Sequence, residues 1–249
     1  MVVKTIPTLV AHRGYPSRYP ENTLLGIKAA VQAGARWFEF DVQLSKDHVP
    51  YLCHDDTLER TAGDRRSIFD LNSRELREID VGERARFGAR FTGTPPTPLM
   101  DLAEWLKEQP GARAFVEIKA ESLEHFGHAL VVKQVMGAVQ PVLERCVIIS
   151  FDAPCLKLAR QLGAGPVGWA LEDASPRTVK MAAEFKPEYL FVGDALFAEA
   201  HVALNGPWKW AVYQVQDPDY AVKLTEQGAD LVETDAVGEM LAAFTPKPA

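Results

Sequence analysis

The chain has 249 residues, of which 27 are Lys or Arg and 34 are Asp or Glu, and its formal net charge is −7 at pH 7. Such a chain is not expected to bind nucleic acid broadly, because that binding needs a basic surface that displaces counterions from the phosphates. A small anionic substrate remains compatible, since the local field of a site can differ from the net charge. No apolar run approaches the length of a membrane span, so we expect no membrane insertion.

The first predicted element is a strand. The segment MVVKTIPTLVAHRG contains a short apolar stretch that leads directly into a His-Arg-Gly sequence. A signal peptide would have a longer apolar region and a cleavage site of small residues, so we interpret this segment as the start of the fold. The next segment, NTLLGIKAAVQAG, predicts a helix that begins near Asn22 and ends at Gly34.

The second predicted strand, WFEFDVQL at residues 37–44, contains two acidic residues. Because strand side chains alternate between faces, Glu39 and Asp41 point to one side and the aromatic and aliphatic residues point to the other. Two neighbouring carboxylates near a core are costly unless a positive group compensates them. The sequence therefore raises the question of what compensates this pair.

A further β-like run, VPYLCHD, follows after only four residues, SKDH. This connection is too short for a helical crossover and predicts a hairpin. If Lys46 and Asp47 form a two-residue turn, Ser45 pairs with His48, and Glu39 then lies opposite His54 at the end of the return strand. If His48 instead takes the bulge position of a three-residue loop, the register shifts by one residue. In both registers His54 returns to the height of Glu39 and Asp41.

Residues from about 56 to 93 are rich in Arg, Asp, Glu, Ser and Gly. This stretch contains one short helical segment, in which Asn72 and Glu75 fit a capping box. The segment TGTPPTP marks the return to regular alternation. We interpret residues 56–93 as a small insertion over one end of the fold and not as an independent domain.

Strand-like and helical segments alternate through the rest of the chain. The strand-like runs are AFVEIKAE, CVIISF, VGWALE, EYLFVGD, WAVYQV and ADLVETD. Three helices carry sequence signals at their ends. The predicted N-caps are Thr97, Asp152 and Asp217; Pro98 and Pro218 follow two of these caps, and Gly163 and Gly228 lie just past the ends of two helices. The count of eight strands between helices predicts an α/β fold, a TIM (β/α)₈ barrel with a β-hairpin after strand 2. A doubly wound open sheet would normally use fewer strands, and we expect a single domain over residues 1–249.

Functional side chains of such barrels gather at the carboxyl ends of the strands. The polar residues at these positions are His12 and Arg13, Glu39 and Asp41, His54 and Asp55, Glu117 and Lys119, and Glu233, Thr234 and Asp235. Each has a structural alternative: a strand carboxylate is often an ion-pair partner, and a lone histidine is more often a satisfied core residue. Because all of them fall at matching strand ends, the joint pattern predicts a functional site.

Three of these residues predict a metal site. Glu39, Asp41 and Glu117 supply hard oxygen ligands without any Cys, which suits Mg²⁺ or Ca²⁺ better than Zn²⁺. A single divalent cation would compensate the paired carboxylates of WFEFDVQL. We therefore expect one divalent cation, Mg²⁺ or Ca²⁺, as the cofactor.

The remaining basic residues at the strand ends favour phosphate chemistry. Arg13 and Lys119 add positive charge, and the Arg guanidinium matches two phosphate oxygens. His12 and His54 titrate near neutral pH and can act as base and acid on opposite sides of a reacting phosphorus. The other four histidines are interpreted as turn or surface residues: His48, His125, His128 and His201.

The residues and their order resemble the glycerophosphodiester phosphodiesterase family, in its bacterial, cytoplasmic form. The similar stretches are AHRG, PENT, FEFDVQLSKDHVPYLCHD with TLERTAG, EIK, SF and the final ADLVETD, and they cover nearly the whole chain in order. The segment from Ala11 to Thr61 is the most specific. The resemblance implies a TIM barrel that hydrolyses glycerophosphodiesters to sn-glycerol 3-phosphate and an alcohol.

The resemblance also implies a role for each site residue. It implies that the acid and base are His12 and His54. The implied metal ligands are Glu39, Asp41 and Glu117. The implied substrate-binding residues are Arg13, Lys119, Tyr213 and Gln216. In the implied route a glycerol hydroxyl attacks phosphorus and water opens the cyclic phosphate. Three positions depart from the family: His48 replaces a turn glycine, YQVQ replaces WTVN, and Val237 replaces a proline.

Three rival functions remain open. A phospholipase D-like lyase on the same scaffold would need an exposed apolar rim, and a non-catalytic barrel that binds phosphate esters would have lost a histidine or a metal ligand. A metal-dependent sugar isomerase would favour more ligands and two metals. The expected partner is a small glycerophosphodiester, and a homo-oligomer is left open. The cysteines, Cys53, Cys146 and Cys155, fit no metal module and favour reduced thiols, so we expect a cytoplasmic protein.

Overall fold

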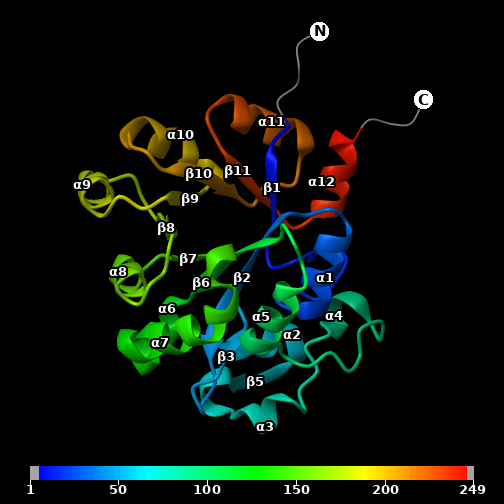
Figure 1. The fold of residues 1–249 in the computed structure, drawn as a ribbon. Helices are drawn as coiled ribbons and strands as arrows, with labels where there is room; N and C mark the ends of the chain where they lie inside the picture. Colours follow the sequence, from blue (N-terminus) through cyan, green and yellow to red (C-terminus); the bar gives the residue numbers. More distant parts are fainter. Residues whose placement is uncertain (1–5, 246–249) are drawn as a thin grey trace.

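The computed structural model describes residues 6–245, in which eight parallel strands form a closed barrel (Figure 1). The barrel strands are β1 (Thr8–Ala11), β2 (Trp37–Leu44), β6 (Arg113–Ile118), β7 (Cys146–Ser150), β8 (Val167–Ala170), β9 (Tyr189–Gly193), β10 (Lys209–Tyr213) and β11 (Leu231–Thr234). Strand β1 pairs with both β2 and β11, which closes the barrel. All eight strands coincide with predicted runs, so the predicted (β/α)₈ barrel is confirmed. The part of the first predicted strand at residues 1–5 lies outside the described residues.

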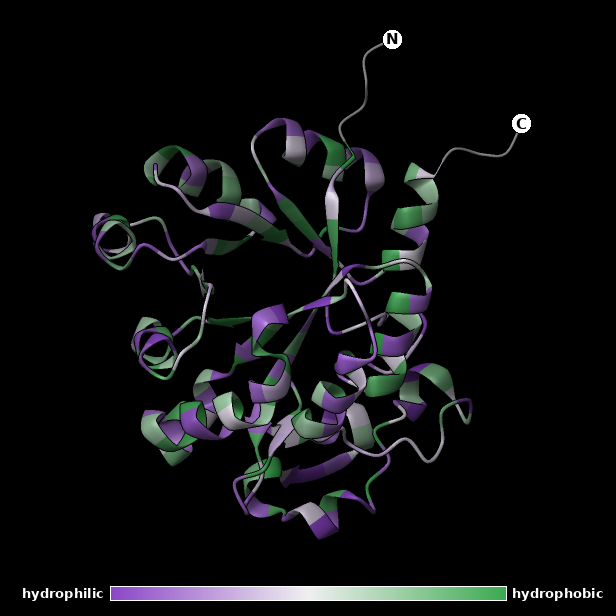
Figure 2. Cartoon of the chain, viewed as in Figure 1, coloured by the Kyte–Doolittle hydropathy of each residue, from purple (hydrophilic) through white to green (hydrophobic). Residues whose placement is uncertain are grey.

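Helices surround the barrel as an outer ring (Figure 1). They are α1 (Leu24–Gln32), α5 (Leu99–Lys107), α6 (Ala120–Phe126), α7 (His128–Val139) with the 3₁₀ turn η2 (Gln140–Arg145), α8 (Ala153–Gln161), α9 (Pro176–Phe185), α10 (Asp194–Ala203), α11 (Pro218–Glu226) and α12 (Val237–Phe244). Figure 2 shows hydrophobic and hydrophilic residues interleaved along these helices, as expected for amphipathic helices on a core. Within the described residues, no helix has the length and apolar character needed to cross a membrane.

Helix ends follow the predicted cap residues at most positions. The Asp152 carboxylate accepts a hydrogen bond from the Cys155 backbone N–H, and Asp217 caps α11 in the same way. Thr97 was predicted as the cap of α5, and this prediction is wrong. The N-cap is Pro98, and the Thr97 hydroxyl instead accepts a hydrogen bond from the backbone N–H of Leu24, at the start of α1.

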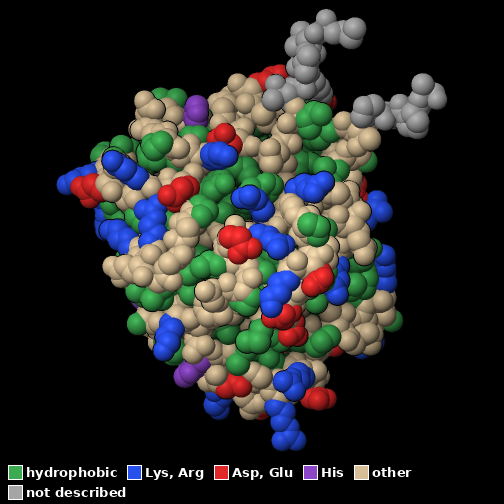
Figure 3. All heavy atoms as spheres, in the orientation of Figure 1, with side chains coloured by type: hydrophobic (Ala, Val, Ile, Leu, Met, Phe, Trp, Pro, Cys, Tyr) green, Lys and Arg blue, Asp and Glu red, His purple; other side chains and the backbone are tan. Residues whose placement is uncertain are grey.

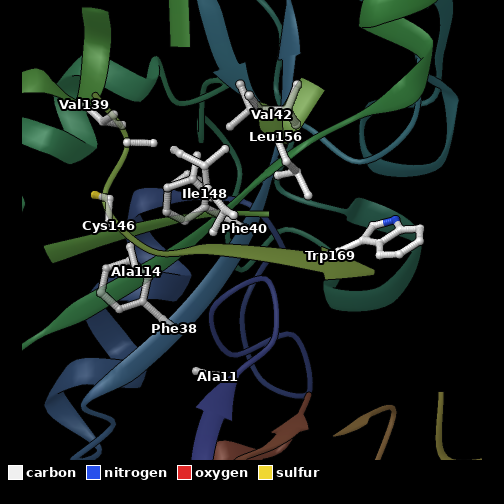
Figure 4. Packing of buried hydrophobic residues seen from close by; sticks show 14 of the residues in the cluster. Ala11, Phe38, Phe40, Val42, Ala114, Val139, Cys146, Ile148, Leu156 and Trp169 are labelled. Carbon is white, nitrogen blue, oxygen red and sulfur yellow. The ribbon is translucent and has the colours of Figure 1, made fainter. Parts of the chain in front are cut away.

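The alternating side chains of β2 separate the two layers of the core. Phe38, Phe40 and Val42 are fully buried between the barrel and the helices, where they pack with residues of β6, β7, α7 and α8 (Figure 4). Burial of such a side chain contributes roughly 1.5–3 kcal/mol. The barrel interior has its own apolar cluster, which includes Phe115 and Phe191. The opposite face of β2 carries Glu39 and Asp41 into this interior, above the apolar cluster.

The predicted hairpin is present and has the three-residue register. Strand β3 (Pro50–Leu52) runs antiparallel to β2, with Leu44 opposite Pro50 and Val42 opposite Leu52. His48 has a φ of 63°, in the left-handed region that closes such a loop. The backbone N–H of Cys53 donates to the carbonyl of Asp41 over 3.0 Å, so the return arm brings the next residue, His54, beside the acidic pair.

The insertion contains more structure than the one predicted helix. Its elements are β4 (Thr57–Leu58), α2 (Glu59–Ala62), β5 (Asp64–Ser67), the 3₁₀ turn η1 (Ile68–Asp70), α3 (Ser73–Leu76) and α4 (Arg84–Phe87). They gather beside β3 and α5 at the bottom of Figure 1, over a cluster of their own that includes Ile68 and Leu76. Strands β4 and β5 form a small antiparallel sheet, which the sequence did not predict because β4 is very short and β5 is mostly charged. The predicted capping box of Asn72 and Glu75 is present.

Candidate active site

A cavity of about 240 Å³ opens at the carboxyl ends of the barrel strands. Its wall divides into two parts. The polar part consists of His12, Arg13, Glu39, His54, Glu117, Lys119 and Glu233, and the other part consists of Ile149, Phe151, Ala170, Phe191, Tyr213 and Gln214. The cavity therefore brings together seven of the nine residues predicted for the site. Of the other two, Asp41 lies behind the wall at 1% exposure, and Gln216 lies outside this cavity.

The three predicted metal ligands form one compact group. Oxygen atoms of Glu39, Asp41 and Glu117 lie within 4.8 Å of one another. The group exists because Asp41 of β2 is directly opposite Glu117 of β6, and Glu39 is two residues earlier on the same face. Glu39 Oε1 is buried and accepts no hydrogen bond from any described residue. An orphaned carboxylate oxygen among three hard ligands fits a divalent cation.

Basic side chains compensate this group only in part. Arg13 Nε lies 3.1 Å from Asp41 Oδ2, and Lys119 Nζ lies 3.5 Å from Asp41 Oδ1 and 2.9 Å from Glu117 Oε1. Burial alone would raise the pKa of Asp41, but Arg13 and Lys119 hold it below its usual value. Burial and the Asp41 charge raise the pKa values of Glu39 and Glu117. The basic groups near these two carboxyls do not balance their negative charge, and a bound cation would supply the missing positive charge.

Asn22 fixes the orientation of Asp41. Its Nδ2 donates to Asp41 Oδ2 over 2.8 Å, and its Oδ1 accepts from the Asp41 backbone N–H over 3.1 Å. Asn22 adopts a φ of 50°, and Arg13 adopts a φ of 51° while its backbone N–H donates to Glu39 Oε2. Left-handed conformations outside glycine are strained and concentrate at functional sites. From the sequence, Asn22 was predicted only to lie near the start of a helix. Its place in the PENT stretch was the sequence feature that could have indicated a role in the site.

Each of the two predicted catalytic histidines has an aspartate partner. His12 Nδ1 lies 2.7 Å from Asp235 Oδ1, and His54 Nδ1 lies 2.6 Å from Asp55 Oδ1. An Nδ1–H that donates to a carboxylate leaves Nε2 as the proton-exchanging atom of each ring. Burial lowers the pKa of His12, but the hydrogen bond to Asp235 and the charge of Glu233 raise it above its usual value.

The insertion reaches the site through Arg60 of α2. Its Nε donates to Asp55 Oδ2 over 2.8 Å, and its two terminal nitrogens donate to the Glu21 carboxylate over 2.7 and 2.8 Å. Arg13 also donates to Glu21, over 3.2 Å. The network therefore connects the partner of His54 to the arginine beside the acidic group. The sequence did not identify it, because its bonded pairs lie up to 39 residues apart.

The profile of the glycerophosphoryl diester phosphodiesterase family matches residues 12–239. The chain belongs to this family. A glycerophosphodiester phosphodiesterase of Bacillus altitudinis is 29% identical over 155 residues, 62% of each chain, and one of Caldanaerobacter subterraneus subsp. tengcongensis is 34% identical over 101 residues, 41% of each chain. The matched segments thus span less than two thirds of these relatives.

Solved structures of similar proteins have the same fold. A phosphodiesterase of Oleispira antarctica, in complex with the product sn-glycerol-3-phosphate, superposes with a TM-score of 0.83 and 24% identity over 96% of both chains. A glycerophosphodiester phosphodiesterase of Thermotoga maritima superposes with a TM-score of 0.73 and 23% identity over 96% of this chain and 99% of that one. These likenesses establish that the barrel architecture is the one found for glycerophosphodiester phosphodiesterases.

Of the three departures from the glycerophosphodiester phosphodiesterase pattern, His48 and Val237 lie outside the cavity wall, whereas the YQVQ stretch contributes Tyr213 to that wall. His48 closes the hairpin, and Val237 begins α12. Gln216 lies in a second hollow of about 680 Å³, which shares His12 and Arg13 with the cavity. Gln216 Nε2 donates to Asp235 Oδ2 over 3.0 Å, so in this protein Gln216 holds the aspartate partner of His12.

Glu233 is the charged member of the cavity wall to which the sequence assigned no role. It stands at the end of β11 with 3% of its surface exposed, and its Oε1 accepts no hydrogen bond within the described part of the chain. Burial and the charges of Glu117 and Asp41 raise its pKa to about 7, although His12 opposes this shift. Its position at a strand end was visible in the sequence, but its lack of a partner was not.

Proposed function

We propose that this protein hydrolyses glycerophosphodiesters to sn-glycerol 3-phosphate and an alcohol, with one divalent cation and with His12 and His54 as the acid and base. The observation that carries the proposal is the composition of one cavity. Two histidines whose Nδ1 atoms contact aspartates, two basic side chains and two carboxylates of the group that fits a cation line a space of about 240 Å³, and the third carboxylate, Asp41, is buried behind this wall. Membership of the glycerophosphoryl diester phosphodiesterase family supports the same substrate class.

Arg13 and Lys119 would bind the phosphate group. Both side chains are at the cavity wall, and both are held by carboxylates that fix their positions. A guanidinium presents two parallel N–H groups to phosphate oxygens, and an ammonium acts as a point charge. Because the two side chains are held before the substrate arrives, little side-chain ordering would be needed on binding.

The two histidines would move the protons. A glycerol hydroxyl attacks phosphorus while one histidine accepts its proton at Nε2. The other histidine donates a proton to the oxygen of the leaving alcohol as the phosphorus–oxygen bond to that alcohol breaks. With the two roles exchanged, water then opens the cyclic glycerol phosphate to give sn-glycerol 3-phosphate. Asp235 and Asp55 would hold the rings in the required tautomer and orientation through Nδ1.

Glu39, Asp41 and Glu117 would hold the cation, with Mg²⁺ or Ca²⁺ as the proposed ion. When bound there, a divalent cation supplies Lewis-acid stabilisation of charge on a phosphoryl oxygen. Asn22 and Lys119 would keep the Asp41 oxygens in place. A non-catalytic phosphate-binding barrel is a weaker proposal for this site, because both histidines and all three carboxylates are present in the cavity wall or buried behind it.

The test is hydrolysis of sn-glycero-3-phosphocholine by the purified protein, with release of sn-glycerol 3-phosphate measured in Mg²⁺ or Ca²⁺. We expect turnover with at least one of these ions and its loss when a chelator is added, with recovery when the ion is restored. Absence of product from this and other glycerophosphodiesters, with either ion, would overturn the proposed function. Turnover that survives chelation would overturn only the role of the cation.

A further inference from the structure

Glu233 is a buried carboxylate whose function the mechanism above does not use. It shares the inward face of β11 with Leu231, two residues earlier, which belongs to the apolar cluster of the barrel interior. Its side chain forms part of the cavity wall, and only 3% of the residue is exposed. Oxygen Oε1 accepts no hydrogen bond from a described residue. A buried acceptor without a donor is destabilising, and more so when it is charged.

Within the described residues no ion pair or hydrogen bond joins the Glu233 carboxylate to another charged group, although the charge of His12 acts on it. Glu233 is not a member of the carboxylate group whose oxygens lie within 4.8 Å of one another. The nearby bases are committed elsewhere: His12 pairs with Asp235, and Arg13 pairs with Asp41. The side chain is therefore neither a fourth member of the metal group nor half of an ion pair.

On one side Glu233 faces His12 of the neighbouring β1 segment, but on the β10 side the cavity wall is apolar, and this limits what can lie against it. Tyr213 stands at the end of the neighbouring strand β10, and Phe191 and Ile149 continue the wall across β9 and β7. A fitting ligand is a short alkyl chain whose carbon atoms contact these side chains and which ends in a hydrogen-bond donor. The glycerol part of the proposed substrate has this chemistry.

We propose that Glu233 is a specificity-determining residue, which accepts a hydrogen bond from the terminal hydroxyl of the glycerol group. This inference rests on the proposed function, in which the middle hydroxyl attacks phosphorus and the terminal one is left free. An acylated or alkylated terminal oxygen carries no hydrogen, so it leaves the buried carboxylate unpaired and adds bulk. Glu233 thus selects deacylated glycerophosphodiesters and rejects lysophospholipids. Sites that hydrogen-bond a substrate hydroxyl discriminate strongly against analogues that lack it.

The test compares two substrates that both keep the attacking hydroxyl. One is sn-glycero-3-phosphocholine, and the other is its 1-deoxy analogue, 2-hydroxypropyl phosphocholine. For the natural enzyme we expect kcat/KM to favour the glycerol substrate by at least about tenfold, which corresponds to about 1.4 kcal/mol. In Glu233→Leu this ratio should fall to about threefold or less, mainly through a higher KM for the glycerol substrate. A ratio that stays unchanged in Glu233→Leu would overturn the inference.

Two further measurements keep the test decisive. Glu233→Gln keeps the size of the side chain with a weaker acceptor, so its ratio should lie between those of the natural enzyme and Glu233→Leu, and it replaces Glu233→Leu if that variant does not fold. Glu226→Gln, which changes an exposed carboxylate on α11, is the matched control and should keep the natural ratio.

Calorimetry of sn-glycerol 3-phosphate and of 2-hydroxypropyl phosphate binding to the protein gives the same comparison without turnover. If the natural protein binds the two ligands with different affinity but hydrolyses neither substrate, the proposed function fails while the role of Glu233 stands; equal affinities overturn the role of Glu233.

Discussion

The cavity has two unlike sides. The side formed by β1, β2 and β6 carries carboxylates, basic groups and His12, and most of these side chains form hydrogen bonds or ion pairs with one another or with neighbouring residues. The side formed by β7 to β10 carries Ile149, Ala170, Phe191 and Tyr213, with few polar atoms. The first side is suited to moving protons and holding charge, whereas the second is suited mainly to recognising shape and apolar surface. Substitutions on the two sides should therefore change different kinetic constants.

The largest effect is expected for the two histidines. His12→Ala and His54→Ala each remove one proton-transfer group, which in enzymes is worth roughly 10²–10⁴-fold in rate. We expect kcat to fall by that amount, with folding unchanged by circular dichroism. His125→Ala removes an exposed histidine outside the cavity and should keep the natural kcat. Near-normal kcat in either cavity variant would remove that histidine from the mechanism.

A smaller effect is expected behind the charged side, at Asn22. Asn22→Ala removes both hydrogen bonds that orient Asp41. Loss of a group that orients a metal ligand typically costs about 10–100-fold in metal affinity. We expect the apparent dissociation constant for Mg²⁺ or Ca²⁺, measured by thermal shift or calorimetry, to rise by that factor. Because binding needs Glu39 deprotonated and the pKa of Glu39 is raised, affinity should also weaken as pH falls.

Asn72→Ala is the control for this variant. Asn72 caps α3 in the insertion and has no contact with the acidic group. It should lose stability and leave the metal affinity unchanged. Equal affinity of the natural protein and Asn22→Ala would separate Asn22 from the metal site.

A still smaller effect is expected on the apolar side. Phe151 follows β7 at the cavity wall with 36% exposure, so its ring can cover a bound substrate. In Phe151→Ala we expect KM for sn-glycero-3-phosphocholine to rise about tenfold, equivalent to about 1.4 kcal/mol of binding, with kcat within a factor of about two. Phe151→Leu keeps apolar surface and should recover most of the affinity. A fall in kcat without a change in KM would contradict the assignment of catalysis to the charged side and of substrate binding to the apolar side.

The sequence predicted the charged side better than the apolar side, for a physical reason. Glu39 and Asp41 stand out because charges in an otherwise apolar strand conflict with burial, and the period of two places them on one face. Ile149 and Phe191 look like any core residues, and only the closed barrel shows that they border a cavity. The hairpin fixed the height of His54, but the choice between its two registers depended on the left-handed conformation of His48.

The elements that the sequence missed depend on contacts between distant parts of the chain. Thr97 has the residue type of a helix cap, but its hydroxyl is used by Leu24, 73 residues away. Asn22 and Asp41 are 19 residues apart, and Arg60 and Glu21 are 39 apart. Such pairs follow from the folded geometry and not from local pattern. The positions at the strand ends therefore predicted which residues meet in the site. Only the structure showed which residues orient them through hydrogen bonds and ion pairs.

The smallest effect is expected for stability at the edge of the charged side, where Asp235 meets His12. The pKa of His12 is raised, so its stabilisation is complete below its unfolded value of about 6.5 and is lost as pH rises through the folded value. The pKa of Asp235 is lowered, against the effect of burial, by the hydrogen bond from His12, so its stabilisation is lost as pH falls through the folded value. The pair should therefore stabilise the fold most between about pH 4 and 6.5.

Since the Asp235 side chain is 44% exposed, Asp235→Asn should lower the free energy of unfolding by at most about 1 kcal/mol in this pH range, or Tm by about 2–4 °C, and by less at pH 9. Asp101→Asn, an exposed control on α5, should not show this pH dependence, and a difference for Asp235→Asn that grows toward pH 9 would contradict the assigned pairing.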